Sequence, residues 1–170
     1  MINRPNAGEY SDYAGRYVNL VGNDPILGIL EKQKEESYRL FSRLDEIKAA
    51  YAYAEGKWTI KQVVGHMADT ERVFAYRALV FSRESIVLPG FDQDVYMQDT
   101  TFNNRTIEDL AAELKVVREA SIYLFKSLTD EQSAKTGIAS GSTFSVRAYA
   151  YMIAGHERHH LNILKERYLI

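Results

Sequence analysis

The chain has 170 residues, of which 46% are hydrophobic, 26% charged and 12% aromatic, a composition that supports one compact domain and excludes a disordered chain. The 21 lysines and arginines nearly balance the 23 acidic residues, for a formal net charge of −2, so we do not expect binding of nucleic acid through a broad basic face. There is no cysteine, which excludes disulfide scaffolds, thiolate metal sites and cysteine nucleophiles.

The N-terminal stretch MINRPNAGEYSDYAGRYV lacks the apolar core of a secretory signal. No stretch approaches the ~18–20 uninterrupted apolar residues of a membrane span. We therefore expect a cytoplasmic protein that forms one domain over residues 1–170 and does not bind a membrane. Residues 1–23 are expected to pack as an extension on the rest of the fold through Tyr10, Tyr13 and Tyr17.

The first helix is predicted to begin at Asp24-Pro25, an N-cap followed by the residue favoured at the first helical position, and to run to about Ala50. Its apolar residues recur at helical spacing. They are Ile26, Leu27, Leu30, Tyr38, Phe41, Leu44 and Ile47.

The second helix has the clearest start signal, the sequence WTIKQV at 58–63. The Thr59 hydroxyl and the Gln62 side chain form a capping box, and Trp58 and Val63 stand at the positions of a hydrophobic staple. This helix is predicted to last until about Ser82.

The third helix is predicted from Thr106 to about Leu128, and the fourth from Ser145 almost to the C-terminus. Strand signals are confined to the short runs 86–88 and 49–54, so any sheet should be marginal. Four helices of this length predict an all-α fold, a four-helix bundle.

The connections suggest how these helices are ordered. The short link between the first two suits antiparallel neighbours, whereas the link from Arg83 to Arg105 is much longer. A helix of ~25 residues spans about 37 Å, and more than 20 extended residues cover that distance. A crossover would make the third helix parallel to the second and the fourth antiparallel to both, although a folded surface loop would use the same residues.

The four histidines are the most informative feature of the sequence. On a helical wheel, His160 falls near the middle of the fourth helix's apolar stripe, His156 lies about 40° away, and His159 faces the flank at roughly 100°. His66 lies at the edge of the second helix's apolar stripe and reaches a similar depth if these helices are antiparallel. His159 is therefore assigned to the surface or to the support of the other histidines.

Three neutral imidazoles inside an apolar bundle need a partner for their lone pairs, and a divalent cation supplies one. We therefore predict a metal site at His66, His156 and His160, with ordinary hydrogen bonds in the core as the alternative. We expect one ion per chain, zinc or nickel first, with iron, manganese or copper also compatible. Three protein ligands leave a coordination position open, which is typical of a catalytic site.

Two metalloenzyme motifs fit less well. Residues 156–160 match H-E-x-x-H, the zinc protease helix, but no histidine follows His160, Glu166 faces about 100° away from His156, and no sheet edge is predicted to hold a peptide. A di-iron bundle needs a second Glu-x-x-His unit, which the second helix lacks.

The loop at 88–96 combines turn residues with two acids and two aromatics. It could act as a lid that brings Asp92 and Asp94 over the open metal position. We favour the simpler interpretation, a crossover loop held down by Phe91 and Tyr96.

The segments WTIKQVVGH at 58–66, PGFDQD at 89–94 and GHERHHL at 155–161 resemble the DinB/YfiT-like superfamily, over essentially the whole chain. This family is distinct from the DNA polymerase of similar name. The resemblance implies a four-helix bundle of up-down-down-up connectivity, often dimeric. It also implies a divalent metal held by one histidine of the second helix and two of the fourth, which match His66, His156 and His160.

Characterised members of the family include metal-dependent transferases of low-molecular-weight thiols and a thiol-dependent isomerase, and many others are labelled hydrolases. The leading hypothesis is a metal-dependent transfer of a small thiol to an electrophile, in detoxification or stress, because a metal presents thiolate at neutral pH. Metal-dependent hydrolysis is the alternative, with Glu157 or an acid of residues 92–94 as the base. A non-enzymatic metal- or ligand-binding bundle is the third. The expected partners are a small-molecule substrate and a second copy of the chain.

Overall fold

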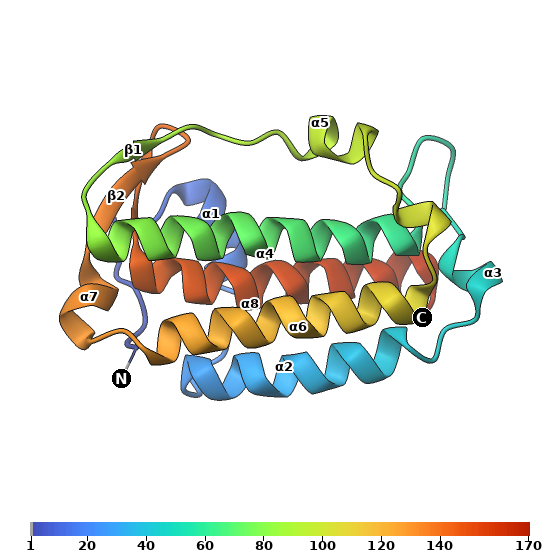
Figure 1. The fold of residues 1–170 in the computed structure, drawn as a ribbon, viewed down its shortest axis with the longest axis horizontal. Coiled ribbons are helices and arrows are strands. Elements are labelled where there is room, and N and C mark those ends of the chain that lie inside the picture. Colours follow the sequence, from blue (N-terminus) through green and yellow to red (C-terminus); the bar gives the residue numbers. More distant parts are fainter. Residues whose placement is uncertain (1) are drawn as a thin grey trace.

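Four long helices lie side by side in the computed structural model, which describes residues 2–170 (Figure 1). They are α2 (Ile26–Phe41), α4 (Ile60–Arg83), α6 (Ile107–Lys126) and α8 (Val146–Ile163). α6 packs against both α2 and α4, and α4 also packs against α8. In Figure 1, α4 and α6 both begin at the end of the bundle where α3 (Glu46–Ala49) lies, whereas α2 and α8 end there.

Side-chain caps start three of these helices where the sequence predicts them. The capping box of α4 is present: the Thr59 hydroxyl accepts from the Gln62 amide at 3.1 Å, and the Gln62 side chain accepts from the Thr59 amide at 2.9 Å. Thr106 and Ser145 cap α6 and α8 by accepting an amide hydrogen from the third helical residue. These predicted starts are confirmed, because each cap satisfies donors that the first turn leaves unpaired.

The first predicted helix is wrong at its C-terminal end. α2 ends at Phe41 rather than near Ala50, and Pro25 rather than Asp24 occupies its N-cap. The Asp45 side chain accepts from the Lys48 amide at 2.8 Å and starts the separate helix α3. A short acidic side chain that caps the following turn competes with continuation of the helix before it. Ile47, placed on the apolar face from the sequence, is 89% exposed.

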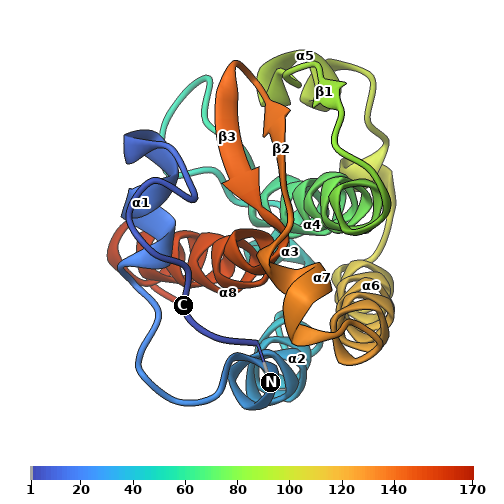
Figure 2. The same cartoon turned by 90° about the vertical axis from the view of Figure 1, so that its left-hand side faces the viewer.

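A small sheet at one end of the bundle corrects the all-α expectation (Figure 2). Within residues 2–170, β1 (Val87–Leu88) pairs in parallel with β2 (Thr136–Ala139), which pairs antiparallel with β3 (Ser142–Ser145). The turn between β2 and β3 has positive φ at Ser140 (52°) and Gly141 (75°), as in a tight type I′ hairpin. The two strands of this hairpin are short and carry few apolar residues, so their periodicity gives little signal.

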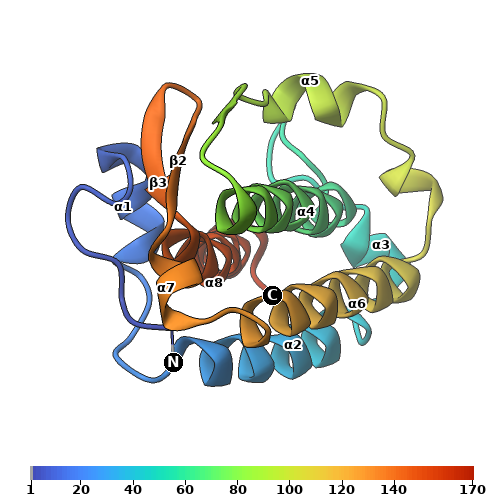
Figure 3. The ribbon, with the colours of Figure 1, turned by 60° about the vertical axis from the view of Figure 1, so that its left-hand side comes forward.

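The link between α4 and α6 runs back along α4 and contains α5 (Gln93–Gln98) and the 3-10 turn η1 (Phe102–Asn104) (Figures 1 and 3). Phe91 is half-buried and its ring contacts Phe74 of α4, at a centroid distance of 6.5 Å. Tyr96, the second predicted anchor, is 51% exposed, and the buried Met97 and Phe102 take that role instead. The segment therefore lies over α4 beside the bundle.

A polar layer divides the apolar core. One apolar cluster lies towards the sheet and includes Phe81 and Tyr149, and the other lies towards the C-terminus of α8 and includes Ile60 and Leu110. The buried polar residues between them come from all four long helices. They are Gln33, Ser37, His66, Thr70, Glu71, Arg118, His156 and Glu157.

The N-terminal segment packs on α8 through α1 (Asp12–Val18). Tyr17 is buried, whereas Tyr13 is 59% exposed, so the three tyrosines do not contribute equally. A Cβ atom at Gly155 of α8 would lie 2.0 Å from the carbonyl oxygen of Tyr17, so the close approach of the two helices requires glycine there. No helix of residues 2–170 is long and apolar enough to cross a membrane.

We predict that Gly155→Ala lowers the free energy of unfolding by about 1–3 kcal/mol, because the added methyl meets backbone that has no free rotation to escape it. Gly28→Ala on α2 is the matched control, since nothing lies within 4 Å of its Cβ position. It should raise stability by about 0.5–1 kcal/mol, because alanine loses less chain entropy than glycine in a helix. Urea denaturation of both variants measures this, and equal effects would contradict the close-approach argument.

An ion pair also holds the N-terminal segment on α8. The Arg147 Nε donates to Glu9 Oε2 at 2.6 Å, and a second bond joins Arg147 Nη2 to Glu9 Oε1. This bonding lowers the pKa of Glu9 from its ordinary 4.5 to about 2. A carboxyl with a lowered folded-state pKa contributes stability above its ordinary pKa and loses it as the pH falls through the folded value.

Glu9→Gln should therefore cost about 1–2 kcal/mol at pH 7. The difference from wild type should shrink as the pH is lowered from 4.5 to about 2, where the native Glu9 takes up its proton. Urea denaturation across this pH range measures the effect. Glu55→Gln, at an exposed loop position, serves as the control and should follow the wild type at every pH. A constant offset for Glu9→Gln down to pH 2 would argue against the ion pair.

Candidate metal centre

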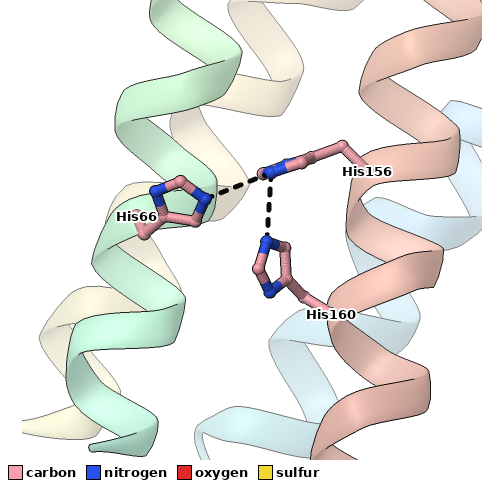
Figure 4. Close-up of side chains that lie close together, drawn as sticks. All are labelled: His66, His156 and His160. Carbon is pink, nitrogen blue, oxygen red and sulfur yellow. Dashed lines mark hydrogen bonds between the residues drawn. The ribbon is translucent and has the colours of Figure 1, made fainter. Parts of the chain in front are cut away.

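Three histidines from two helices meet inside the bundle (Figure 4). His66 lies on α4, and His156 and His160 lie one turn apart on α8. The Nε2 atom of His156 is 3.2 Å from Nε2 of His66 and 3.0 Å from Nε2 of His160. The structure thus brings together the three residues that the sequence predicts as ligands.

Burial keeps these imidazoles neutral. It lowers the pKa of His66 to about 4, and, with repulsion from His66 and His159, that of His160 to about 3. The pKa of His156 lies well below its ordinary value for the same reason, with added repulsion from the neighbouring histidines. A neutral imidazole keeps a lone pair, which is what a metal ion requires of it.

The surroundings hold the rings in place. His66 packs against Trp58 at a centroid distance of 4.8 Å, and Thr70 Oγ1 lies 3.4 Å from its Nδ1 atom and 3.5 Å from its Nε2 atom. The His156 ring packs edge-on against Tyr17 at 5.3 Å. Aromatic packing of this kind restricts the orientation of histidine rings.

The donor set fits a divalent cation. For a tetrahedral ion with metal–nitrogen distances of about 2.0–2.1 Å, ligand nitrogens lie about 3.3 Å apart, and the contacts of His156 to its two neighbours are close to this value. Nitrogen donors of this type suit zinc and other late first-row ions. His66, His156 and His160 would hold the ion, and a cavity lined by Gln93 and Asp94 of the α4–α6 link reaches His160.

His159 and Glu166, also considered from the sequence, lie outside the cluster of three. The half-buried His159 ring packs against Tyr17 at 5.5 Å and lies beside His160 at 5.2 Å. Glu166 is exposed on η2 (Leu164–Tyr168), the π-helical turn that follows α8. Neither is placed to complete the ligand set.

Glu157, the acid of the H-E-x-x-H pattern, forms hydrogen bonds in the bundle interior rather than with the histidines. Its Oε2 atom accepts from Arg118 Nη2 at 2.6 Å, and its Oε1 atom accepts from the Ser37 hydroxyl at 2.7 Å. Both partners lie on helices α6 and α2, in the bundle interior. The structure therefore argues against Glu157 as a base for the histidine cluster and against the protease interpretation of this motif.

Arg118 connects two carboxylates at the centre of the bundle. It is 2% exposed, and its guanidinium donates to Glu71 of α4 at 2.8–3.1 Å as well as to Glu157 of α8. Burial lowers the pKa of Arg118, but the charges of the two glutamates outweigh it, and the net shift is upward. Together with Ser37, this network joins all four long helices directly beside the histidines.

Two cavities among the described residues reach the histidines from different sides. One of about 560 Å³ reaches His156. The other, of about 460 Å³, reaches His160 past Trp58 and Tyr168. Gln93 at the start of α5 lines both, so the segment expected only to cross over also covers the centre.

The acids of this segment differ in their availability. Asp92 accepts from the amides of Asp94 and Val95 and so serves as the N-cap of α5. The Asp94 carboxylate lines the cavity at His160 and, within residues 2–170, makes no hydrogen bond or ion pair of its own.

The sequence-based reasoning does not find Arg118, Glu71 or Arg77, a buried arginine that lines the larger cavity. One signal for Arg118 was present, because it stands four residues from both Leu114 and Ile122, on the apolar stripe of its helix. A charged residue in such a stripe needs a buried partner.

The chain is similar to known proteins in sequence and in fold. A family model described as the DinB superfamily matches residues 29–164. A protein of Oceanobacillus iheyensis, provisionally named a metal-dependent hydrolase, is 30% identical over 125 residues, which cover 72% of this chain and 71% of that protein. YfiT from Bacillus subtilis, described as a probable metal-dependent hydrolase with an unusual four-helix bundle topology, superposes with a TM-score of 0.73 at 16% identity, over 96% of this chain and 90% of that chain.

We predict that Glu157→Ala lowers the free energy of unfolding by about 3–5 kcal/mol, because it leaves Arg118 with one counter-ion in a buried site. Glu166→Ala, an exposed acid on the following turn, should stay within about 0.5 kcal/mol of the wild type. Chemical denaturation measures both. A fully stable Glu157→Ala protein with lost activity would instead support a role as base.

Proposed function

The chain belongs to the DinB superfamily, and on this basis we propose that it is a divalent-metal-dependent hydrolase of a small molecule. One observation carries the proposal: three neutral imidazoles meet by their Nε2 atoms beside a cavity. The names of the two relatives support the reaction class.

When bound, a divalent ion supplies Lewis-acid chemistry, which polarises a carbonyl and lowers the pKa of water. His66, His156 and His160 would hold it, and zinc or nickel suits them best, with iron, manganese or copper as alternatives. Trp58 and Tyr17 would keep the rings oriented. His66 and His156 are buried, and a less polar surrounding strengthens polar interactions with the substrate.

Asp94 is our candidate for the proton acceptor. Its carboxylate lines the cavity at His160 and has no competing partner in the described chain. Asp92 is engaged as the cap of α5, and Glu157 is held by Arg118 and Ser37. Asp94 is thus the one acid of the three whose carboxylate makes no hydrogen bond or ion pair within residues 2–170.

Thiol transfer, the leading hypothesis from the sequence, becomes the second candidate. The names of the relatives do not mention it, but two cavities reach the histidines, at His156 and His160, and a transfer reaction needs room for two substrates. Because the chain has no cysteine, the thiol would have to come from a small molecule.

The metal site is tested by elemental analysis of protein purified without added ions. Wild type should contain about one divalent ion per chain, His160→Ala should lose it, and the neighbouring His159→Ala should retain it, because His159 is outside the cluster. Absence of metal from wild type, even after incubation with zinc and nickel, would contradict the metal site and indicate that the histidines only form hydrogen bonds in the core.

The reaction is tested by screening small esters and amides with and without an added thiol. Hydrolysis should proceed without thiol, and Asp94→Asn should lower kcat about 10²–10⁴-fold with metal content unchanged, the range for loss of a general base. Asp99→Asn, at the exposed C-terminal end of α5, is the control and should keep full activity. Turnover that requires the thiol would favour the transferase candidate over the hydrolase.

A further inference from the structure

A buried arginine side chain without a counter-ion lines the cavity at His156. Arg77 of α4 is 6% exposed and lines this cavity. Its Nη2 atom donates to the carbonyl oxygen of Pro89 at 2.8 Å and lies 3.5 Å from the Ser140 hydroxyl. Within residues 2–170, no carboxylate forms an ion pair with it.

Arg118, the other deeply buried arginine, differs from Arg77 because its charge is balanced by carboxylates. Arg118 is held between Glu71 and Glu157, whereas the hydrogen bonds of Arg77 go to neutral oxygens. A buried guanidinium without an anion carries an uncompensated desolvation cost. A cation of this kind at a cavity wall is therefore placed to receive an anion that the chain itself does not provide.

A second polar group beside Arg77 also lacks a partner. The hydroxyl of Tyr149, a residue with no exposed surface, makes no hydrogen bond. Burial raises the pKa of this hydroxyl, and the charge and side chain of Arg77 act in the opposite direction, so Arg77 lies close to the hydroxyl but outside hydrogen-bond distance. An anion held by Arg77 would offer this hydroxyl the acceptor that it lacks.

The rest of the cavity wall is mixed, with polar side chains and one apolar stretch. The wall between Arg77 and His156 includes the rings of Phe74 and Phe91 and the side chain of Met152. Arg77 and the ligand His66 stand eleven positions apart on α4, about 16 Å by helix rise. A molecule that reaches both ends must therefore be elongated, with an apolar part against these three side chains.

We propose that Arg77 binds a carboxylate group of the substrate, with an apolar segment along the cavity and the reacting bond at the histidines. The position of the reacting bond rests on the proposed function, but the carboxylate site does not. A single negative charge fits best, because Arg77 is the only lysine or arginine among the described residues that line the cavity, and Asp92 also lines it. Arginine binds carboxylates through paired N–H donors, which gives direction as well as charge.

The proposal is tested with a matched pair of probes, 4-phenylbutyrate and the neutral 4-phenylbutanol, by calorimetric titration of the full-length protein. The carboxylate should bind about 10- to 100-fold more tightly, the range for a charge-assisted hydrogen bond. Arg77→Gln, which keeps a donor for Pro89 but removes the charge, should abolish this preference. Arg83→Gln, on the exposed last turn of the same helix, should retain it.

Tyr149→Phe separates ligand binding from folding. Removing a hydroxyl that has no partner should leave Tm unchanged or higher, yet it should weaken the carboxylate about fivefold and leave the alcohol unaffected. A loss of Tm with no change in the preference for the carboxylate would contradict the role of this hydroxyl.

The titrations are repeated after treatment with EDTA. A preference for the carboxylate that persists supports Arg77 whether or not the histidines bind a metal. A preference that disappears with EDTA, or that survives Arg77→Gln, would overturn the proposal, because the anion would then be bound elsewhere. Since the metal content of the protein is measured separately, failure of the metal centre and failure of the carboxylate site are distinguishable.

Discussion

Arg118 and the two glutamates that surround it are the constraint on which the rest of the bundle depends. A buried guanidinium must be paired, and here its partners come from the two helices that carry the histidines, with Ser37 adding a bond from α2. Since side chains on a helix have fixed directions relative to its axis, pairing Glu71 and Glu157 with Arg118 sets the rotation of α4 and α8. The adjacent His156 is thereby turned towards α4, where His66 meets it.

This polar layer explains how a bundle with an apolar interior can hold a cluster of three histidines. Apolar clusters on both sides anchor the helices, while the layer between them carries the groups that need solvent or a ligand. Glu157 and His156 are neighbours in the chain but face different partners, one the bundle interior and the other a cavity. The same short motif thus serves both stability and the candidate metal site.

The segments that complete the site are those with the weakest sequence signals. The link that carries α5 lies over α4 because Phe91, Met97 and Phe102 find apolar surface there, and it brings Asp94 to the cavity at His160. The β2–β3 hairpin and Pro89 lie beside Arg77, so the sheet that periodicity does not predict forms part of the second end of the larger cavity. Such contacts depend on residues distant in the chain.

The sequence by itself determined the four long helices, three of their caps and the three histidines that meet, because helical periodicity, capping chemistry and i, i+4 spacing are local properties. Only the tertiary structure decided that Glu157 pairs with Arg118 and that Arg77 remains without an anion. It also decided that α2 stops at Phe41. Whether a charge is paired, exposed or unpaired at a cavity wall depends on side chains from other helices. Local sequence patterns do not show which of these side chains lie nearby.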